Sequence, residues 1–480
     1  MSPTERLEIT PEIAENLVTI VNQRIESLGT PGIFATIFQG EQVLFEVGRG
    51  VRVAEGETPD SNTIFRIASC TKSFTITALL KLRGEGKLNL DQLITDFVPE
   101  FTFSSLSTSK SIPTLRHLAS MSAGLPTDDP WADRQESITP EALREIVKKG
   151  VSSTSTTGAL FQYSNLGFAL LGLVIERASG RDFREFVSTE ILSPLGMDQT
   201  GFNAGDFQEV NLAKGYRKVD ERWLELPFSK SGSFSSIGGL FSSGRDLRIW
   251  SNWLYSALDE DKKEFGPLSA SSRREMQFIS TPALPSSELG TLPKNSGRVS
   301  GYGLGLFVEY DQRFGQFVSH SGGYPGFSSH MRWHVPTGLS VVVLENATYS
   351  GAMASAIALL EGALEALNYQ LPKPEIWPVT YEFAAKADSL IHEWSDDLAF
   401  EIFSENVGLD IPFPERRAII SQLIEDIGGL KEPSGIVLKR SDSPVHLVWK
   451  VAGGQGELTC EIRLTPDIPI KIQTFSVKKA

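Results

Sequence analysis

The chain has 480 residues and a mass of 52.6 kDa, and its 45 basic and 59 acidic side chains give a formal net charge of −14. The hydrophobic fraction of 40% and the charged fraction of 22% are ordinary for a folded protein, which excludes a disordered chain, a collagen-like chain and a disulfide scaffold. The acidic balance argues against general electrostatic binding to nucleic acid or to an anionic membrane.

The sequence predicts no targeting signal and no membrane segment. At the N-terminus no basic stretch precedes an apolar run, as it would in a secretory signal. The longest apolar stretches, residues 168–175 and 352–360, fall short of the roughly 18–20 residues that cross a bilayer. The two cysteines, Cys70 and Cys460, fit no metal-ligand spacing. We therefore expect a cytoplasmic protein with no membrane contact, no metal and no cofactor.

Strand-like segments occur early in the chain and again after residue 300. The apolar spacing at 11–28 predicts a helix, which two strands follow, and a later group of strands precedes a helix at about 351–367. The middle, about residues 70–275, is mostly helical. This order predicts one sheet built from N-terminal and C-terminal segments beside a helical region. The predicted strands are residues 32–38, 42–47, 305–309, 316–319, 327–335 and 339–344.

Three prolines close together mark a linker at residues 372–378, because proline discourages regular structure. The sequence therefore divides into a domain at 1–371, this linker, and an α+β domain at 379–480. The role of the last domain is open, with one hypothesis that it leans over an active-site mouth. Its predicted elements are helices at 380–397 and 414–427 and strands at 436–450 and 456–478. Its expected core aromatics are Trp377, Phe383, Trp394, Phe400, Phe403, Phe413 and Trp449. A Pro/Ser/Gly-rich stretch at 282–301 predicts a long exposed loop that shapes a pocket.

Ser69 and Lys72 are the first candidates for chemistry. They begin a predicted buried helix, and a separation of three residues places them on one helical face. A serine hydroxyl needs a neighbouring base before it becomes a good nucleophile, and a lysine whose pKa is lowered by burial can serve. The pattern alone is weak, because Ser107 and Lys110 repeat it in a Ser/Thr-rich loop with no helix after it.

Two later segments complete a recognisable set. Tyr163 and Asn165 precede an apolar helix, and His320, Ser321 and Gly322 end a predicted strand. The motifs Ser-x-x-Lys, Tyr-x-Asn and His-x-Gly in this order resemble those of the serine β-lactamase and penicillin-binding-protein superfamily, in particular its class C β-lactamase, carboxypeptidase and esterase branch. The resemblance covers about residues 12–368. Supporting stretches lie at 115–118, 122–126, 195–197, 238–242 and 302–305.

The resemblance implies a β-lactamase-like α/β (α+β) fold, with an antiparallel sheet flanked by terminal helices and a helical subdomain. It makes Ser69 the acylated nucleophile and Lys72 the group that holds or accepts its proton. Tyr163 becomes the general base for acylation, with its pKa lowered by Lys72, and the acid that returns a proton to the leaving group. Asn165 would hydrogen-bond Lys72 or the substrate, His320 and Gly322 would support the site, and the backbone N–H groups of Ser69 and Gly323 would form an oxyanion hole. Without the resemblance, Tyr163 is a packing or capping residue and Asn165 a helix N-cap.

The third motif departs from the Lys-Thr-Gly of class C β-lactamases. A neutral His320 supplies no fixed charge for a substrate carboxylate, which disfavours β-lactamase activity. We predict a hydrolase or acyltransferase for an ester, thioester or lactone, whose partner is a small acyl substrate, free or carrier-linked. The alternatives are a D-stereospecific peptidase or amide-forming cyclase and a non-catalytic binding or assembly protein. The acyl group, the acceptor and the oligomeric state stay open. His330 and His334 are expected to be a solvent-facing strand pair rather than zinc ligands.

Overall fold

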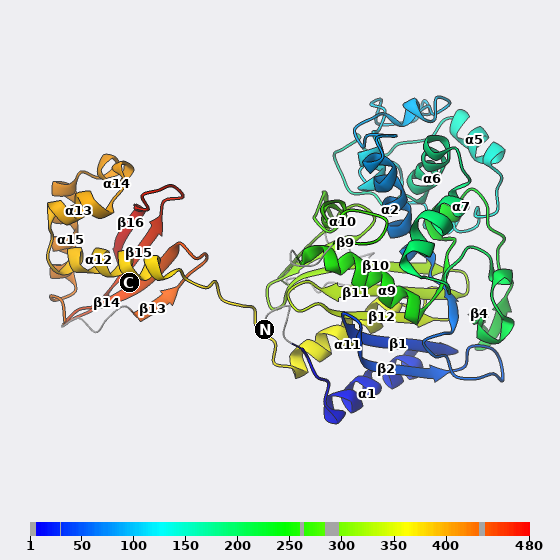
Figure 1. Cartoon of the computed structure of the whole chain (residues 1–480), viewed down its shortest axis with the longest axis horizontal. Coiled ribbons are helices and arrows are strands. Elements are labelled where there is room, and N and C mark those ends of the chain that lie inside the picture. Colours follow the sequence, from blue (N-terminus) through cyan, green and yellow to red (C-terminus); the bar gives the residue numbers. More distant parts are fainter. Residues whose placement is uncertain (1–5, 29, 260–263, 284–296, 432–436) are drawn as a thin grey trace. The chain divides into compact units, whose positions relative to one another are not determined.

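The computed structural model describes residues 6–28, 30–259, 264–283, 297–431 and 437–480. The chain divides into two compact units, residues 1–370 and 371–480 (Figure 1). None of the helices within the described ranges has the length and apolar content that a membrane span requires.

The larger unit is built around one eight-stranded antiparallel sheet, in the order β2-β1-β12-β11-β10-β9-β8-β7. Strand β1 lies between β2 and β12, so the beginning of the unit pairs with its end, which confirms the predicted sheet and fold class. The strands are β1 (Gly32–Gln39), β2 (Gln42–Gly50), β7 (Thr281–Ala283), β8 (Arg298–Tyr302), β9 (Phe307–Asp311), β10 (Gly315–Tyr324), β11 (Phe327–His334) and β12 (Leu339–Glu345).

Both faces of this sheet are buried against helices, and successive β1 side chains point to opposite faces. Ile33, Ala35 and Ile37 join the core beneath α1 and α11, whereas Phe34 and Phe38 join the larger core shared with α9 and the helical region. The sheet therefore separates two apolar cores (Figure 1). These helices are α1 (Pro11–Leu28), α9 (Gly244–Tyr255) and α11 (Ala352–Ala366).

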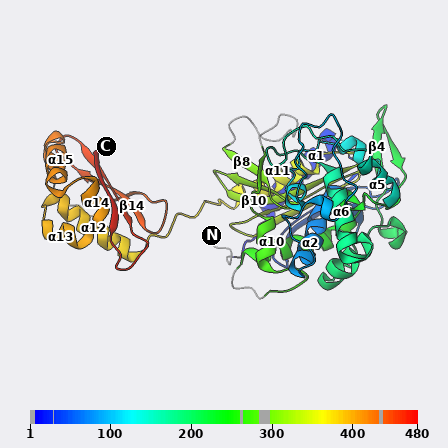
Figure 2. The same cartoon turned by 90° about the horizontal axis from the view of Figure 1, so that it is seen from above.

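The helical region is centred on α2 and α6, which lie side by side (Figures 1 and 2). Almost every residue of both helices is buried up to the last turn, although α2 includes several polar side chains in its first two turns. Its helices are α2 (Thr71–Gly84), α3 (Leu115–Ala119), α4 (Asp129–Ala132), α5 (Pro140–Lys148), α6 (Asn165–Ser179), α7 (Phe183–Val187), α8 (Ser235–Gly238) and α10 (Ala270–Met276). Two short strand pairs, absent from the prediction, also occur: β3 (Ile64–Arg66) with β6 (Phe241–Ser243), and β4 (Gly215–Val219) with β5 (Arg222–Leu226).

The stretch at 282–301, expected to be an exposed loop, is a loop only in part. Its ends belong to β7 and β8, which pair with each other at the sheet edge, and residues 284–296 lie outside the described ranges. The prediction was wrong at the ends because backbone pairing overrides the local Pro/Ser/Gly composition there.

In its described residues the smaller unit has four helices and a four-stranded antiparallel sheet in the order β13-β14-β15-β16. Trp449 and Phe403 are buried in its core, as expected, but Trp377 and Phe400 are 49% and 68% exposed. Phe400 lies outside because α13 turns Ala399 and Ile402 inward. The elements are α12 (Pro378–His392), α13 (Asp396–Ile402), α14 (Glu405–Asp410), α15 (Phe413–Asp426), β13 (Val437–Arg440), β14 (His446–Ala452), β15 (Glu457–Leu464) and β16 (Ile472–Lys479).

His330 and His334 do not face solvent, contrary to the prediction. Both are at most 1% exposed, because α11 packs over their side of β11. His330 Nδ1 lies 2.8 Å from Ser321 Oγ, and the His334 imidazole lies between Thr337 Oγ1 at 2.8 Å and the Phe314 carbonyl at 2.6 Å. Both imidazole rings therefore form hydrogen bonds inside the protein.

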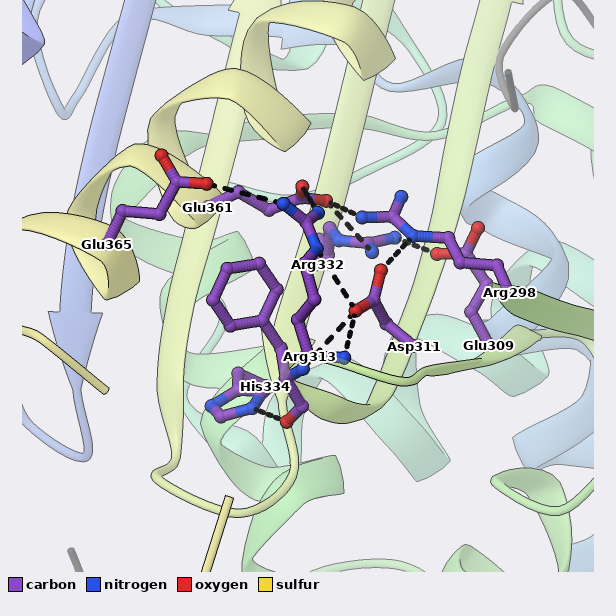
Figure 3. Close-up of polar contacts among 9 residues, drawn as sticks. Arg298, Glu309, Asp311, Arg313, Arg332, His334, Glu361 and Glu365 are labelled. Atoms are coloured by element: carbon purple, nitrogen blue, oxygen red, sulfur yellow. Dashed lines mark hydrogen bonds and ion pairs between the residues drawn. The ribbon is translucent and has the colours of Figure 1, made fainter. Parts of the chain in front are cut away.

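A charged cluster connects α11 to the sheet (Figure 3). Glu361 of α11 accepts hydrogen bonds from Arg298 and Arg313, and Arg298 also donates to Asp311 at 2.5 Å. Arg332 of β11 lies 3.9 Å from the Glu361 carboxylate. Because Arg298, Asp311 and Arg332 are almost fully buried, Glu361 balances positive charge that water does not reach.

Replacing Glu361 with alanine is therefore expected to lower the free energy of unfolding by about 1–3 kcal/mol, because it removes one of the carboxylates that balance the buried Arg298 and Arg332, which keep Asp311 and Glu309 as partners. Glu365→Ala is the matched control, since Glu365 lies one turn later on α11, is 61% exposed, and pairs with the exposed Arg313. That variant should lose less than about 1 kcal/mol. Urea unfolding of the full chain gives both values, and equal losses would contradict the structural role given to the cluster.

Candidate active site

Ser69 lies in a tight turn between a short strand and a buried helix. Strand β3 leads into a 3₁₀ turn, Ala68–Cys70, which continues directly as α2. Ala68 has a φ of +46°, a conformation that is uncommon for residues with a side chain and that concentrates at functional sites. The turn leaves Ser69 partly exposed, whereas Lys72 is fully buried.

The Lys72 ammonium has three hydrogen-bond acceptors, one for each of its protons. Nζ donates to Ser69 Oγ at 2.8 Å, to Asn165 Oδ1 at 2.7 Å and to the Ile237 carbonyl at 2.9 Å. Burial lowers the pKa of Lys72 to about 8, and the carboxylates of Asp129 and Asp133 oppose that shift. The structure thus brings together Ser69, Lys72 and Asn165, which the sequence predicted as one group.

Tyr163 lies beside this group. Lys72 Nζ lies 5.0 Å from its ring centroid, and the Ser69 side chain acts to lower the pKa of its hydroxyl. Burial raises the pKa of Tyr163 well above its ordinary value, and the nearby Asp129 adds to the rise. The pKa of Tyr163 is therefore displaced upward, opposite to the lowering expected from Lys72, because burial outweighs the effect of a nearby ammonium.

Two acidic residues hold Asn165 in position. Asp128 accepts the backbone N–H groups of Asn165 at 2.7 Å and Leu166 at 2.9 Å, so it caps the beginning of α6. Asp129 accepts from Asn165 Nδ2 at 2.5 Å, while Asn165 Oδ1 accepts from Lys72. Asn165 therefore connects the lysine to a carboxylate and has only one orientation that satisfies both partners.

His320 is buried and neutral. Its Nδ1 lies 2.6 Å from the Ser321 carbonyl, which can only accept, so Nδ1 carries the proton and Nε2 accepts from the Tyr302 hydroxyl at 3.0 Å. Burial, with Lys72 nearby, lowers the pKa of His320 to about 3. The third motif thus supplies no positive charge, as the sequence indicated.

Gly322 and Gly323 bring β10 close to the turn that carries Ser69. Strand β10 pairs with β9 only as far as Ser319, so its last residues extend beyond that partner. A Cβ on Gly322 would lie 2.2 Å from the Ile67 carbonyl oxygen and 3.1 Å from Ala68 Cβ. A glycine is required here for the strand to approach the turn.

The second Ser-x-x-Lys copy has no comparable surroundings. Ser107 Oγ donates to the Val151 carbonyl at 3.1 Å, and Lys110 is exposed. Burial and the surrounding acceptors therefore distinguish the two copies that the sequence pattern left alike.

The residues matched by a known family cover this whole arrangement. A family model described as Beta-lactamase matches residues 17–364, which include all three motifs. The chain belongs to the beta-lactamase family.

Two relatives share part of the sequence. Protein flp of Staphylococcus aureus (strain COL) is 26% identical to this chain over 347 residues, which cover 70% of this chain and 64% of that protein. Penicillin-binding protein 4* of Bacillus subtilis (strain 168) is 24% identical over 322 residues, which cover 64% of this chain and 66% of that protein. The chain therefore spans less than two thirds of the length of the flp and penicillin-binding relatives that it matches.

Solved structures show the same fold at low identity. An octameric penicillin-binding protein homologue from Pyrococcus abyssi has a TM-score of 0.62 and 20% identity, covering 96% of this chain and 99% of that one. A class C beta-lactamase has a TM-score of 0.60 and 15% identity, covering 75% and 98%. EstCE1, described as a hydrolase with promiscuous acyltransferase activity, has a TM-score of 0.59 and 19% identity, covering 73% and 98%.

Sequence reasoning missed Asp128, Asp129 and Asp133 as neighbours of the site. A local signal existed, since two acidic residues before Pro130 are typical of a helix start, but it does not reveal that this helix faces Lys72. Within the described residues, no group of three or more His, Cys, Asp or Glu side chains is arranged to hold a metal ion.

Gly322→Ala is expected to lower the free energy of unfolding by about 1–3 kcal/mol, because the added methyl group overlaps the Ile67 carbonyl. Gly205→Ala is the control, since a Cβ there meets no atom within 4 Å. That change should be neutral or stabilising by up to about 1 kcal/mol. Urea unfolding of both variants checks this, and a neutral Gly322→Ala would show that β10 does not approach the turn so closely.

Proposed function

We propose that this chain is a serine hydrolase or acyltransferase that cleaves an ester, thioester or lactone through an acyl intermediate on Ser69. The observation that carries the proposal is the 2.8 Å hydrogen bond between Lys72 Nζ and Ser69 Oγ, formed by a lysine whose pKa is lowered to about 8. Such a lysine is a free amine in part near neutral pH and accepts a proton readily.

In acylation, Ser69 Oγ attacks the carbonyl carbon of the donor while its proton passes to the free amine of Lys72. The C–O or C–S bond to the leaving group then breaks, and the leaving group takes up a proton. We assign that proton to Tyr163, because its raised pKa keeps the hydroxyl protonated and its contact with Ser69 places it beside the reacting atoms. Lys72 then returns the proton it holds to Tyr163.

The negative charge that develops on the carbonyl oxygen needs hydrogen-bond donors. We assign this role to the backbone N–H groups of Ser69 and Gly323. In support, the glycine contact at Gly322 brings the end of β10, beyond its pairing with β9, next to the Ser69 turn. Backbone donors fixed by a helix start and a strand need no reorganisation during the reaction.

In deacylation, water or an alcohol attacks the acyl-Ser69 carbonyl and gives its proton to the free amine of Lys72. The bond between the carbonyl carbon and Ser69 Oγ then breaks, and Lys72 returns the proton to Ser69 Oγ. Water leads to hydrolysis and an alcohol to acyl transfer. The description of EstCE1, which shares the fold, supports keeping both outcomes. The neutral His320 supports donors other than β-lactams and peptides with a C-terminal carboxylate, because it offers no charge to bind that group.

Brief exposure to p-nitrophenyl butyrate is expected to add one butyryl group to the protein, detected by intact-protein mass spectrometry. Ser69→Ala should abolish this mass increment, because it removes the nucleophile. Ser107→Ala, in the second Ser-x-x-Lys copy, is the matched control and should be labelled like the wild type. Equal labelling of the wild type and Ser69→Ala would contradict the assignment of the nucleophile.

The value of kcat/KM for p-nitrophenyl butyrate is expected to rise with pH and to level off above about 8, because only the free amine of Lys72 accepts a proton. Below that pH the rate should fall about tenfold per pH unit. Lys72→Arg stays protonated throughout and should lose about 10²–10⁴-fold in activity. A rising limb centred near pH 6 or 10 would contradict Lys72 as the base.

A further inference from the structure

Tyr349 occupies an unusual backbone position between β12 and α11. Its φ of +47° lies in the left-handed region, although the residue is large and 48% exposed. Both neighbours are held in place, since Thr348 Oγ1 donates to the Tyr216 carbonyl at 3.0 Å and Ser350 Oγ donates to Glu345. Surroundings that enforce such a conformation are typical of functional sites.

This conformation directs the Tyr349 side chain past Gly323 towards the helical region. A Cβ on Gly323 would lie 2.6 Å from Tyr349 Cδ1, so the ring lies directly against the end of the third motif. The Tyr349 hydroxyl donates to the carboxylate of Asp133. Asp133 is thereby linked through one aromatic ring to the strand end at which we place the oxyanion hole.

Asp133 and Asp129 lie on the same face of one helical turn, four residues apart. Asp129 reaches the site through Asn165, at 2.5 Å, and Asp133 reaches it through Tyr349. Both carboxylates act on Lys72, together with Asp128. All three carboxylates therefore raise the pKa of Lys72 against the effect of burial.

The two nearby arginines do not neutralise the negative charge of these carboxylates. Arg66 is buried, but it pairs with Glu136, so the two charges cancel. Arg134 follows Asp133 in sequence and acts on the Tyr349 hydroxyl, but its side chain is exposed and solvent screens its charge.

We propose that Asp133, held beside the third motif by Tyr349, is a specificity-determining residue that excludes acyl donors carrying a carboxylate and selects uncharged ones. The inference rests on the proposed function and adds a cause for the substrate class. A neutral His320 merely fails to attract an anionic donor, whereas the Asp133 carboxylate, separated from the strand end by the Tyr349 ring, repels it.

The test compares p-nitrophenyl hexanoate with mono-p-nitrophenyl adipate, which have acyl chains of equal length and differ in the terminal carboxylate. The wild type is expected to prefer the hexanoate by at least tenfold in kcat/KM, after subtraction of spontaneous hydrolysis. Asp133→Asn keeps an acceptor for Tyr349 but removes the charge, and should narrow this ratio at least fivefold through a lower KM for the adipate. The ratio cancels any effect on Lys72 that is common to both esters.

Two further variants separate charge from shape. Tyr349→Phe keeps the ring and the Asp133 charge but removes the hydroxyl that holds Asp133, so its ratio should narrow by less than that of Asp133→Asn. Asp96→Asn makes the same change of net charge at an exposed residue and should also leave the ratio unchanged. A ratio near one in the wild type, an unchanged ratio in Asp133→Asn, or equal narrowing in Asp96→Asn would overturn the inference while the proposed function stands. No hydrolysis and no acyl-enzyme with either ester would overturn both.

Discussion

The site depends on one buried charge, the Lys72 ammonium. A buried ammonium is costly unless each proton has an acceptor, and the three acceptors come from three elements: Ser69 at the start of α2, Asn165 at the start of α6 and Ile237 in α8. They converge only when these helices pack closely. Gly172 permits this, since a Cβ there would lie 2.5 Å from Ser236 Oγ of α8. The polar site and the packing of the apolar helices therefore require each other.

The two faces of the sheet have different roles, because one faces the candidate active site and the other is covered by α11. Along β10, His320 and Gly322 face the helical region, where they meet Tyr302 and the turn before Ser69. Ser321, between them, bonds to His330 on the side covered by α11. The period of two in a strand keeps the reactive arrangement away from the charged cluster around Glu361 (Figure 3). One strand thus contributes to the candidate active site on one face and lies next to the charged cluster on the other, and the two groups of charges stay apart.

What could be predicted from the sequence was local. The spacing of Ser69 and Lys72 defines a helical face, and the two flanking apolar helices indicate burial. The sequence could not indicate that Asp129 contacts Asn165 or that Tyr349 reaches Asp133, because these contacts join residues 36 and 216 positions apart. His330 and His334 were misplaced for the same reason, since a helix distant in sequence covers their strand.

The pKa of Tyr163 shows how the tertiary structure changes a chemical role without changing a residue. The sequence motif places a lysine near a tyrosine, which by itself favours the phenolate. In the fold, burial and the neighbouring carboxylates oppose ionisation, so Tyr163 stays protonated. A site with an ammonium of lowered pKa and a phenol of raised pKa has a clear division between base and acid.

The carboxylates around Lys72 therefore have two effects that cannot be adjusted separately. Burial pulls the pKa of Lys72 down, and Asp129, Asp133 and Asp128 hold it up. Removing Asp133 would increase the free-amine fraction at a given pH and, on the proposal above, would also weaken the repulsion of anionic donors. A chain that gained access to carboxylate-bearing substrates by this route would at the same time shift its rising pH limb to lower pH. Charge selection and the readiness of the base are thus linked through Asp133.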